Sequence, residues 1–305
     1  MRNKDIFRSL HQRITQDMGN RGISKIADEK DFQEAVVTLY GASTVMIVTG
    51  FCIKDTMTGE TDGPMGAVAL AAGLQKLGKE VVLISDQYSE ELLMGCCKVL
   101  ETKVPIEIVP YDGAEAFCVQ LLNQYKPSHV VALERPGRAA DGGCYSMRGE
   151  DLGTIIPDTD ILLKESKHRG ITTVAVGDGG NEMGMGKVKS VIAQLVPEGE
   201  RITAVTEADY LIIADISNWG GYAIVAGLSI LTFQQLLHNE ESEKNMLKAI
   251  IDVGGVDGCT KMRELTVDGL SLEVNLNILK GLQEIVQEHL GNKEEIIRLK
   301  TLQYS

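Results

Sequence analysis

The sequence predicts an α/β fold: a doubly wound, mostly parallel sheet flanked by helices, in a Rossmann-like three-layer arrangement. Short runs of β-branched and aliphatic residues alternate along the chain with segments of helical periodicity. Apolar runs of about five or six residues between helices are typical of parallel strands that are buried on both faces. Repeated β and α units of this length imply right-handed crossovers. We therefore expect at least five strands in one sheet.

Four of these apolar runs end abruptly at acidic and amide side chains set among glycines. In open α/β sheets, ligands bind outside the carboxyl ends of the strands. We therefore expect the four loops to gather at the carboxyl edge of the sheet and to form one pocket there. The loops comprise residues 50–63, 134–150, 177–187 and 215–221.

Residues 1–40 are expected to form a helical segment before the sheet. Ile6, Leu10 and Ile14 recur at the spacing of an amphipathic helix. The basic residues nearby superficially suit a mitochondrial presequence, but Asp5 weighs against one and no apolar signal region is present. No run approaches the roughly 18 apolar residues of a membrane span. We therefore expect a cytoplasmic protein.

Start and stop signals delimit the helices that follow. Pro64 and Pro157 begin two of them, and Gly78 and Gly170 end them, because proline suits the first helical turn and glycine the residue after the last. No linker divides the chain, so residues 1–305 are expected to form a single α/β domain. Helices are expected over residues 31–40, 64–77, 89–100, 114–125, 157–169, 187–196, 221–238, 243–251 and 270–290, and strands over a run from residue 44 and over 81–84, 106–109, 129–133, 171–176 and 210–214.

After Glu134 the alternation breaks for some twenty residues. A loop of that length inside a compact domain is usually functional or mobile. We expect residues 135–153 to form a mobile lid in which Arg138 and Arg148 close on an anion.

The charge of the chain restricts its partners. A formal net charge of -13 argues against binding to nucleic acid or to an anionic membrane surface, which both demand basic surfaces. The six cysteines lack the paired spacing of zinc or redox sites, although a nucleophile stays open at Cys52, Cys144 and Cys259 in glycine-rich loops. A small molecule is the expected partner, and a homo-oligomer stays open.

The segment GDGGNEMGMGK fails as a nucleotide motif. The dinucleotide fingerprint needs glycine where Glu182 stands, and a phosphate loop needs glycine at Asn181 and a hydroxyl at Val188. What remains is Asp178 and Glu182, with Lys187 nearby. Paired carboxylates can split their titration into an acid and a base at neutral pH. Helix capping is the structural alternative.

Two further strand ends carry candidate residues. Glu134 and Arg135 follow a buried strand directly, and Arg138 comes three residues later. Guanidinium groups suit bidentate capture of a carboxylate, although Arg135 could instead pair with Glu134. Asp62, before Gly-Pro, is either an N-cap or part of an ammonium or metal site, and Asn218 is a second candidate for the ammonium.

Taken in order, GNRGI, TGETDGP, ALERPGRAADGG, GDGGNEMGMGK, DISNWGGYA and GCTKM resemble the D-glutamate cyclase-like family, in the form of its carboxyl-terminal domain. The similarity covers nearly the whole chain. It implies an enzyme, a hydro-lyase that closes D-glutamate to 5-oxo-D-proline with loss of water. Two functions of other classes stay open: a non-catalytic amino-acid-binding or regulatory domain, and a metal-dependent phosphotransfer or hydrolase enzyme.

The implied reaction needs a base for the substrate ammonium and an acid that protonates or polarises the γ-carboxylate. From position and chemistry, we expect Glu134, Asp178 and Glu182 to transfer protons. The pattern requires no cofactor, although carboxylates suit magnesium or manganese, which Asp62, Asp178 or Asp215 could hold. The substrate-binding candidates are Asp62, Arg135, Arg138, Asn181, Lys187 and Asn218.

Overall fold

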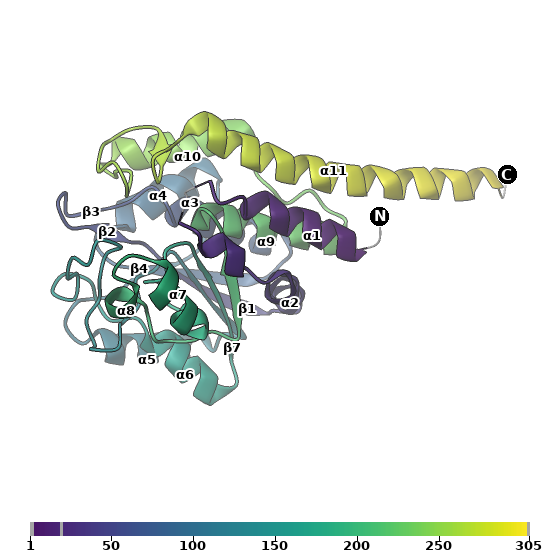
Figure 1. The fold of residues 1–305 in the computed structure, drawn as a ribbon. Helices are drawn as coiled ribbons and strands as arrows, with labels where there is room; N and C mark the ends of the chain where they lie inside the picture. Colours follow the sequence, from purple (N-terminus) through teal and green to yellow (C-terminus); the bar gives the residue numbers. More distant parts are fainter. Residues whose placement is uncertain (1–2, 19–20, 304–305) are drawn as a thin grey trace.

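The computed structural model describes residues 3–18 and 21–303. Its main sheet has six strands in the order β5-β4-β1-β6-β7-β8, and every neighbouring pair is parallel (Figure 1). This confirms the predicted doubly wound α/β fold. The strand order reverses between β1 and β6, as in dinucleotide-binding sheets. The strands are β1 (Thr44–Thr49), β4 (Glu80–Ser85), β5 (Ile106–Ile108), β6 (His129–Leu133), β7 (Thr172–Gly177) and β8 (Tyr210–Ile213).

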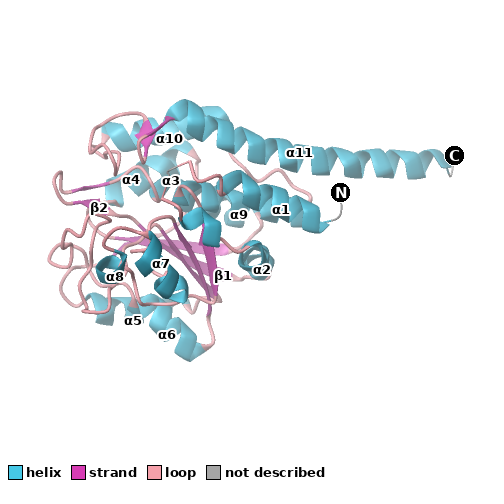
Figure 2. Ribbon diagram, in the orientation of Figure 1, coloured by secondary structure: helices cyan, strands magenta, loops and turns pink. Residues whose placement is uncertain are grey.

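Helices cover both faces of this sheet (Figure 2). One face carries α5 (Ala114–Tyr125), α6 (Ile161–Arg169), α7 (Lys189–Leu195) and the short α8 (Gly199–Ile202). The other carries α3 (Pro64–Lys76), α4 (Glu90–Val99) and α9 (Ser217–Thr232), and over these lie α1 (Asn3–Ile14), α10 (Glu240–Asp252) and α11 (Leu272–Gln303). The helix α2 (Glu29–Tyr40) packs beside β8. The 3-10 turns η1 (Ile23–Ile26) and η2 (Gly186–Val188) precede α2 and α7.

The core has one large apolar cluster on each face of the sheet. Along β1, Val45 and Ile47 belong to one cluster and Met46 and Val48 to the other, because successive side chains of a strand point to opposite faces. Every residue of α9 from 217 to 230 is buried, since this helix lies between the sheet and the outer helices. A helix enclosed in this way must be apolar all round.

Two helices begin at places that the sequence did not predict. α9 starts at Ser217 rather than at 221, because the carboxylate of Asp62 accepts hydrogen bonds from the first N–H groups of the helix, those of Ser217 and Asn218, at 2.9 and 2.8 Å. α6 starts at Ile161 rather than at Pro157, whose carbonyl accepts a hydrogen bond from the side chain of Arg135 at 3.2 Å. In both cases the deciding partner lies far away in the sequence.

Two short hairpins were also not predicted. β2 (Cys52–Ile53) pairs with β3 (Thr58–Gly59) in the loop after β1, and β9 (Thr266–Val267) pairs with β10 (Leu270–Ser271) just before α11. Both are only two residues long per strand, too short for an alternating pattern to stand out. They add walls to the carboxyl edge of the sheet.

Asp215 holds the segment after α1 across this edge. Its carboxylate accepts hydrogen bonds from the backbone N–H groups of Gln16, Asp17 and Met18 at 2.8, 3.0 and 3.0 Å. Both oxygens of Asp215 are turned toward the N-terminal segment, and among the described residues Asp215 does not belong to the group of acids that converge closely enough to hold a metal ion, so the expectation that Asp215 could hold one finds no support. The segment fixed in this way leads directly to Arg21.

Replacing Asp215 by alanine is expected to lower the free energy of unfolding by about 1.5–3 kcal/mol, because hydrogen bonds to a charged acceptor are lost. Chemical denaturation measures this change, and hydrogen exchange of residues 16–18 should become faster. Asp112→Ala, at an exposed aspartate, is the control and should change stability by less than about 0.5 kcal/mol. Equal unfolding free energies of the two variants would contradict the role of Asp215.

Candidate active site

A cavity of about 170 Å³ opens at the carboxyl edge of the sheet, beside the reversal of strand order. Three of the four predicted loops line it, those after β1, β6 and β7. The fourth loop, after β8, contributes through Ser217 and Asn218, which hold Asp62. The volume is below the roughly 300–1,000 Å³ of sites for drug-sized ligands, so it suits a small metabolite.

Four buried acids, here called the acid cluster, gather at the floor of the cavity: Glu60, Glu134 and Asp178 line it, and Asp62 lies beside Glu134 and Asp178. Asp62, Glu134 and Asp178 each offer an oxygen that lies within 4.8 Å of the other two. One oxygen of Glu134 and one of Asp178, Oε2 and Oδ2, are buried without a hydrogen-bond partner. Buried polar atoms are normally satisfied, so these two oxygens indicate a place for a ligand.

The backbone of Glu134 is held in an uncommon conformation. Its φ of 45° lies in the left-handed region, which costs a non-glycine residue about 1–3 kcal/mol. Its N–H donates to the carbonyl of Val176 on β7, and its carbonyl accepts from the N–H of Gly50 after β1, both at 3.1 Å. Gly63 is also required, because a Cβ there would lie 2.9 Å from the Cβ of Glu134. Neighbouring elements thus fix Glu134 in the wall of the cavity.

Burial raises the pKa of every acid in the cluster. The pKa values of Glu60, Glu134 and Asp178 lie well above those of ordinary carboxyl groups, with burial as the largest cause and neighbouring carboxylates as a further one. The pKa of Asp62 is raised to about 7, again mainly by burial and next by the carboxylate of Asp268. Carboxyl groups of this kind can give and take protons near neutral pH.

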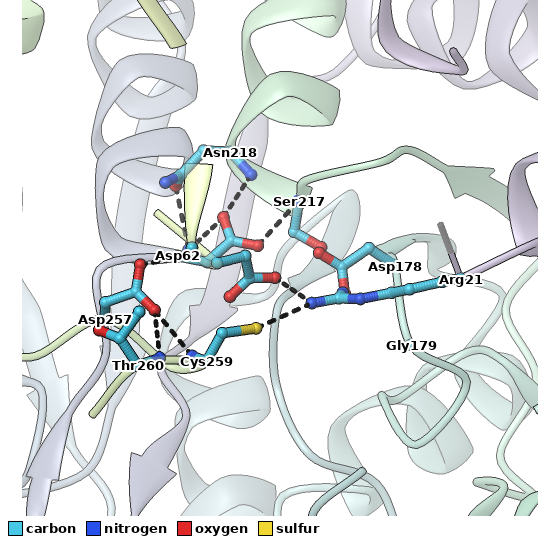
Figure 3. A network of polar contacts seen from close by, with 12 residues as sticks. Arg21, Asp62, Asp178, Gly179, Ser217, Asn218, Asp257, Cys259 and Thr260 are labelled. Atoms are coloured by element: carbon cyan, nitrogen blue, oxygen red, sulfur yellow. Dashed lines mark hydrogen bonds and ion pairs between the residues drawn. The ribbon is translucent and has the colours of Figure 1, made fainter. Parts of the chain in front are cut away.

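Arg21 is the positively charged side chain at the floor of the cavity. Its guanidinium forms ion pairs with Asp178 and with Asp268 at the β9–β10 turn, and lies 3.9 Å from the sulfur of Cys259 (Figure 3). The side chain is 21% exposed. Neither Arg21 nor Asp268 was predicted as a site residue, because neither follows a strand of the main sheet. The only sequence signal for Arg21 is its place in the GNRGI motif.

Glu182 lines the cavity but is bound by its own loop. Its Oε1 accepts hydrogen bonds from the N–H groups of Asp178 and Gly179 at 3.0 and 2.6 Å, and its Oε2 accepts one from Gly180 at 2.6 Å. Three backbone donors occupy a carboxylate that was expected to transfer protons. The structure therefore places Glu182 as the residue that shapes the loop after β7.

The prediction that Arg135 binds a substrate carboxylate is wrong. Its side chain is fully buried and pairs with Asp86 at 2.5 Å, not with Glu134. It also donates to the carbonyl of Gly50 at 3.0 Å and to the hydroxyl of Thr159 at 3.1 Å. It does not line the cavity. Its guanidinium ties the loops after β1, β4 and β6 together.

Arg138 and Lys187 also lie outside the cavity. Arg138 forms an ion pair with Asp158 at 3.2 Å. Lys187 forms an ion pair with Asp31 and donates to the carbonyl of Asp209 at 2.9 Å. Local carboxylates and carbonyls take up both side chains, so the structure lends no support to their predicted roles in substrate binding, which stay predictions. The mobility of the 135–153 loop stays a prediction.

Two predicted amides act as supports. Asn181 lines the cavity, but its side-chain amide donates to the carbonyl of Tyr145 at 2.8 Å. The Oδ1 of Asn218 accepts from the N–H groups of Gly63 and Gly66 at 3.0 and 2.7 Å. Asn218 therefore holds the loop that carries Asp62 and makes no contact with the cavity itself.

The mouth of the cavity is basic where the floor is acidic. Lys54, Arg148 and Lys261 line it, and Lys54 and Arg148 are exposed. Arg148 donates to the carbonyl of Cys259 at 3.0 Å, and Lys261 pairs with Asp55 at 2.6 Å. A small molecule with an ammonium group and carboxylates would match this separation of charge.

The environment of the cysteines near the site disfavours their nucleophilic thiolate form. Burial raises the pKa of Cys52 and Cys144 to about 12 and that of Cys259 to about 11. Only the thiolate is a good nucleophile, and it is scarce at neutral pH for groups like these.

An open α/β sheet with a small charged cavity at its topological switch point defines a Rossmann-like protein, and this position is where such sheets place their ligand sites. A family model described as "D-glutamate cyclase-like, C-terminal" matches residues 10–283. The chain belongs to this family. It is 41% identical over 241 residues to the human protein "D-glutamate cyclase, mitochondrial", a match that covers 74% of this chain and 39% of the human protein. The chain thus spans about two fifths of the length of that relative, at 39%.

No helix in residues 3–18 and 21–303 has both the length and the apolar character needed to cross a membrane. The expected cytoplasmic location stays a prediction.

Glu182→Gln is expected to lower the free energy of unfolding by about 1–3 kcal/mol, because the new NH₂ group must face at least one of the three backbone donors. This prediction separates a loop anchor from a solvated acid. Urea denaturation measures it, with Glu288→Gln, at an exposed glutamate of α11, as the matched control. A Glu182→Gln protein as stable as the control would show that the three hydrogen bonds contribute little.

The acid cluster is expected to make stability fall as the pH rises. Asp62 has an ordinary pKa of 3.8 and a folded pKa of about 7. Between these values the folded protein holds a proton that the unfolded chain releases, so the free energy of unfolding decreases with rising pH. The pKa values of Glu60, Glu134 and Asp178 are raised in the same direction and add to this decrease.

Denaturation between about pH 4 and pH 7, in a buffer with a chelator, measures this decrease, and Asp178→Asn should reduce its slope. The exposed-site variant Glu288→Gln should follow the unsubstituted protein. Parallel pH profiles for the unsubstituted protein and Asp178→Asn would show that Asp178 has no raised pKa.

Proposed function

We propose that this protein closes D-glutamate to 5-oxo-D-proline with loss of water. The observation that carries the proposal is the pairing of a buried acid cluster with a basic mouth in a cavity of about 170 Å³. Family membership and the printed name of the human relative support the same reaction. The class of substrate is an amino acid with a second carboxylate.

The atom balance of the reaction explains the need for several acids. The α-nitrogen forms a bond to the γ-carboxyl carbon, and one γ-oxygen leaves as water. The substrate nitrogen enters as an ammonium with three protons and ends as an amide with one. The two protons that it loses leave, in net, with the departing oxygen. The protein must therefore carry two protons over a short distance, from nitrogen to oxygen.

The acid cluster fits this demand. The unpartnered Oε2 of Glu134 and Oδ2 of Asp178 are the free acceptors for the ammonium protons. Because their pKa values are raised, these carboxyl groups hold a proton more readily than ordinary ones do and can pass it to the leaving oxygen. Glu60 lies in the same wall as a further carrier. The reaction is intramolecular, so correct positioning of the amine against the γ-carboxyl contributes strongly.

We assign the binding of the substrate α-carboxylate to the mouth of the cavity. Arg148 is exposed there, and its guanidinium suits bidentate binding of a carboxylate. Arg21 is already shared between Asp178 and Asp268. We therefore assign Arg21 to orienting the acids and Arg148 to binding the substrate.

A second function, amino-acid binding without turnover, is favoured by one observation. The match covers only 39% of the human relative, so the remaining part of that protein can hold its chemistry. The same cavity would then serve a regulatory or carrier role.

Incubation of the purified protein with D-glutamate or with L-glutamate tests the proposal, with chiral chromatography to detect 5-oxo-D-proline and 5-oxo-L-proline. We expect turnover of D-glutamate, with a loss of about 100-fold or more in Glu134→Gln and in Asp178→Asn, the usual scale for removing an acid or base. The control Glu288→Gln should retain full activity. Melting curves establish that each variant is folded.

The outcomes separate the two functions. A protein that is stabilised against heat by D-glutamate but forms no product supports amino-acid binding, because a ligand that binds only the folded state raises the melting temperature. A protein that shows neither turnover nor stabilisation overturns both. Full activity in Glu134→Gln and Asp178→Asn overturns the assigned roles of these acids.

A further inference from the structure

We propose that Asp62, Glu134 and Asp178 form a binding site for one divalent cation of the magnesium or manganese class at the floor of the cavity. The role of this ion in cyclisation rests on the proposed function, but its binding does not. The site is argued from geometry, from unsatisfied oxygens and from charge.

The three side chains come from separate loops and converge on one point. Their nearest oxygens all lie within 4.8 Å of one another. Oxygens bound to one magnesium ion at about 2.1 Å lie up to about 4.2 Å apart. Ligands in cis positions lie only about 3.0 Å apart, so each side chain would have to move inward by up to about 1 Å to bring all three oxygens into coordination.

Two of the three residues each have one oxygen without a hydrogen-bond partner. Oε2 of Glu134 and Oδ2 of Asp178 are buried without a hydrogen bond, in residues that are 6% and 2% exposed. Leaving a buried polar atom unpaired is costly, and more so for a charged one. A cation would satisfy both atoms at once.

Asp62 is held in place as metal-binding carboxylates commonly are. Its Oδ1 accepts from the N–H groups of Gly63 and Asn218 at 3.0 and 2.8 Å, and its Oδ2 accepts from Ser217 at 2.9 Å. Such outer hydrogen bonds orient a ligand and are characteristic of metal sites. Each oxygen keeps lone-pair capacity for an ion, since a carboxylate offers about four acceptor positions.

The acids at the floor outnumber the one positive charge of Arg21, and this excess of acids favours a further cation. Glu60, Asp62, Glu134, Asp178 and Asp268 face the positive charge of Arg21, which ion-pairs with Asp178 and Asp268. Arg21 binds Oδ1 of Asp178 and leaves Oδ2 unpartnered. The guanidinium and a metal ion can therefore bind different oxygens of the same carboxylate.

The ligand set selects the class of ion. All three ligands are carboxylates, which prefer magnesium, manganese or calcium to soft metals. Histidine is absent from the lining of the cavity in the described ranges, and the sulfur of Cys259 lies against Arg21. Three protein ligands leave coordination positions for water and for one carboxylate of a substrate. An ion there would polarise the γ-carboxylate as a Lewis acid, and Glu134 and Asp178 would then act as its ligands in place of the proton acceptors proposed above.

The test uses the full chain, stripped with a chelator and then dialysed. Titration with Mn²⁺, followed by electron paramagnetic resonance of the free ion, should show one site per chain, from which Mg²⁺ displaces Mn²⁺. Glu134→Gln and Asp178→Asn should each weaken Mn²⁺ binding at least about tenfold, on the scale seen when a metal site loses supporting contacts. Glu288→Gln should bind as the unsubstituted protein does.

A second measurement needs no substitution. Fe²⁺ with ascorbate and peroxide cuts a chain close to a bound iron ion, so fragments should end near residues 62, 134 and 178, and Mg²⁺ should suppress them. Absence of Mn²⁺ binding by the folded chain overturns the site. Binding that both variants leave unchanged, or cleavage at other places, overturns its location.

The metal site and the cyclase function can fail separately. Mn²⁺ binding as expected without conversion of D-glutamate keeps the site and overturns the function. Full conversion in excess chelator by a chain that binds no Mn²⁺ keeps the function and overturns the site.

Discussion

The site depends on the exchange of hydrogen bonds between the Asp62 loop and the start of α9. Asp62 accepts the N–H groups of Ser217 and Asn218, and Asn218 in return accepts those of Gly63 and Gly66. This exchange links the loop after β1 to the helix after β8. It also demands a close approach of α3 and α9, since a Cβ on Gly66 would lie 2.7 Å from the Cα of Asn218. The close packing of α3 against α9 therefore brings the acids of the cluster together.

Gathering acids in this way opposes folding, and the rest of the domain must offset the cost. Each raised pKa means that the ionised carboxylate is less stable in the folded protein than in water. The left-handed backbone of Glu134 adds strain. An apolar cluster on each face of the sheet supplies the opposing free energy. Perturbed acids in a cavity are typical of functional sites rather than of structural ones.

The sequence alone was sufficient to predict the sheet and part of the candidate site. Periodicity and strand ends are local signals, and they predicted six strands and the positions of Asp62, Glu134 and Asp178. What a side chain binds is decided by distant parts of the chain, so Arg135 was mistaken for a substrate ligand although Asp86 holds it. Arg21 was missed for the same reason, because its partners follow it by more than 150 residues.

The route of the chain into the site has a consequence for how this domain can be joined to others. The helix α1 leads through the segment held by Asp215 straight to Arg21, whose guanidinium balances the acids of the floor. A partner domain attached ahead of α1 would pull or push on this helix, and the helix ends only seven residues before Arg21. A domain joined ahead of α1 would therefore be mechanically connected to the charge at the bottom of the cavity.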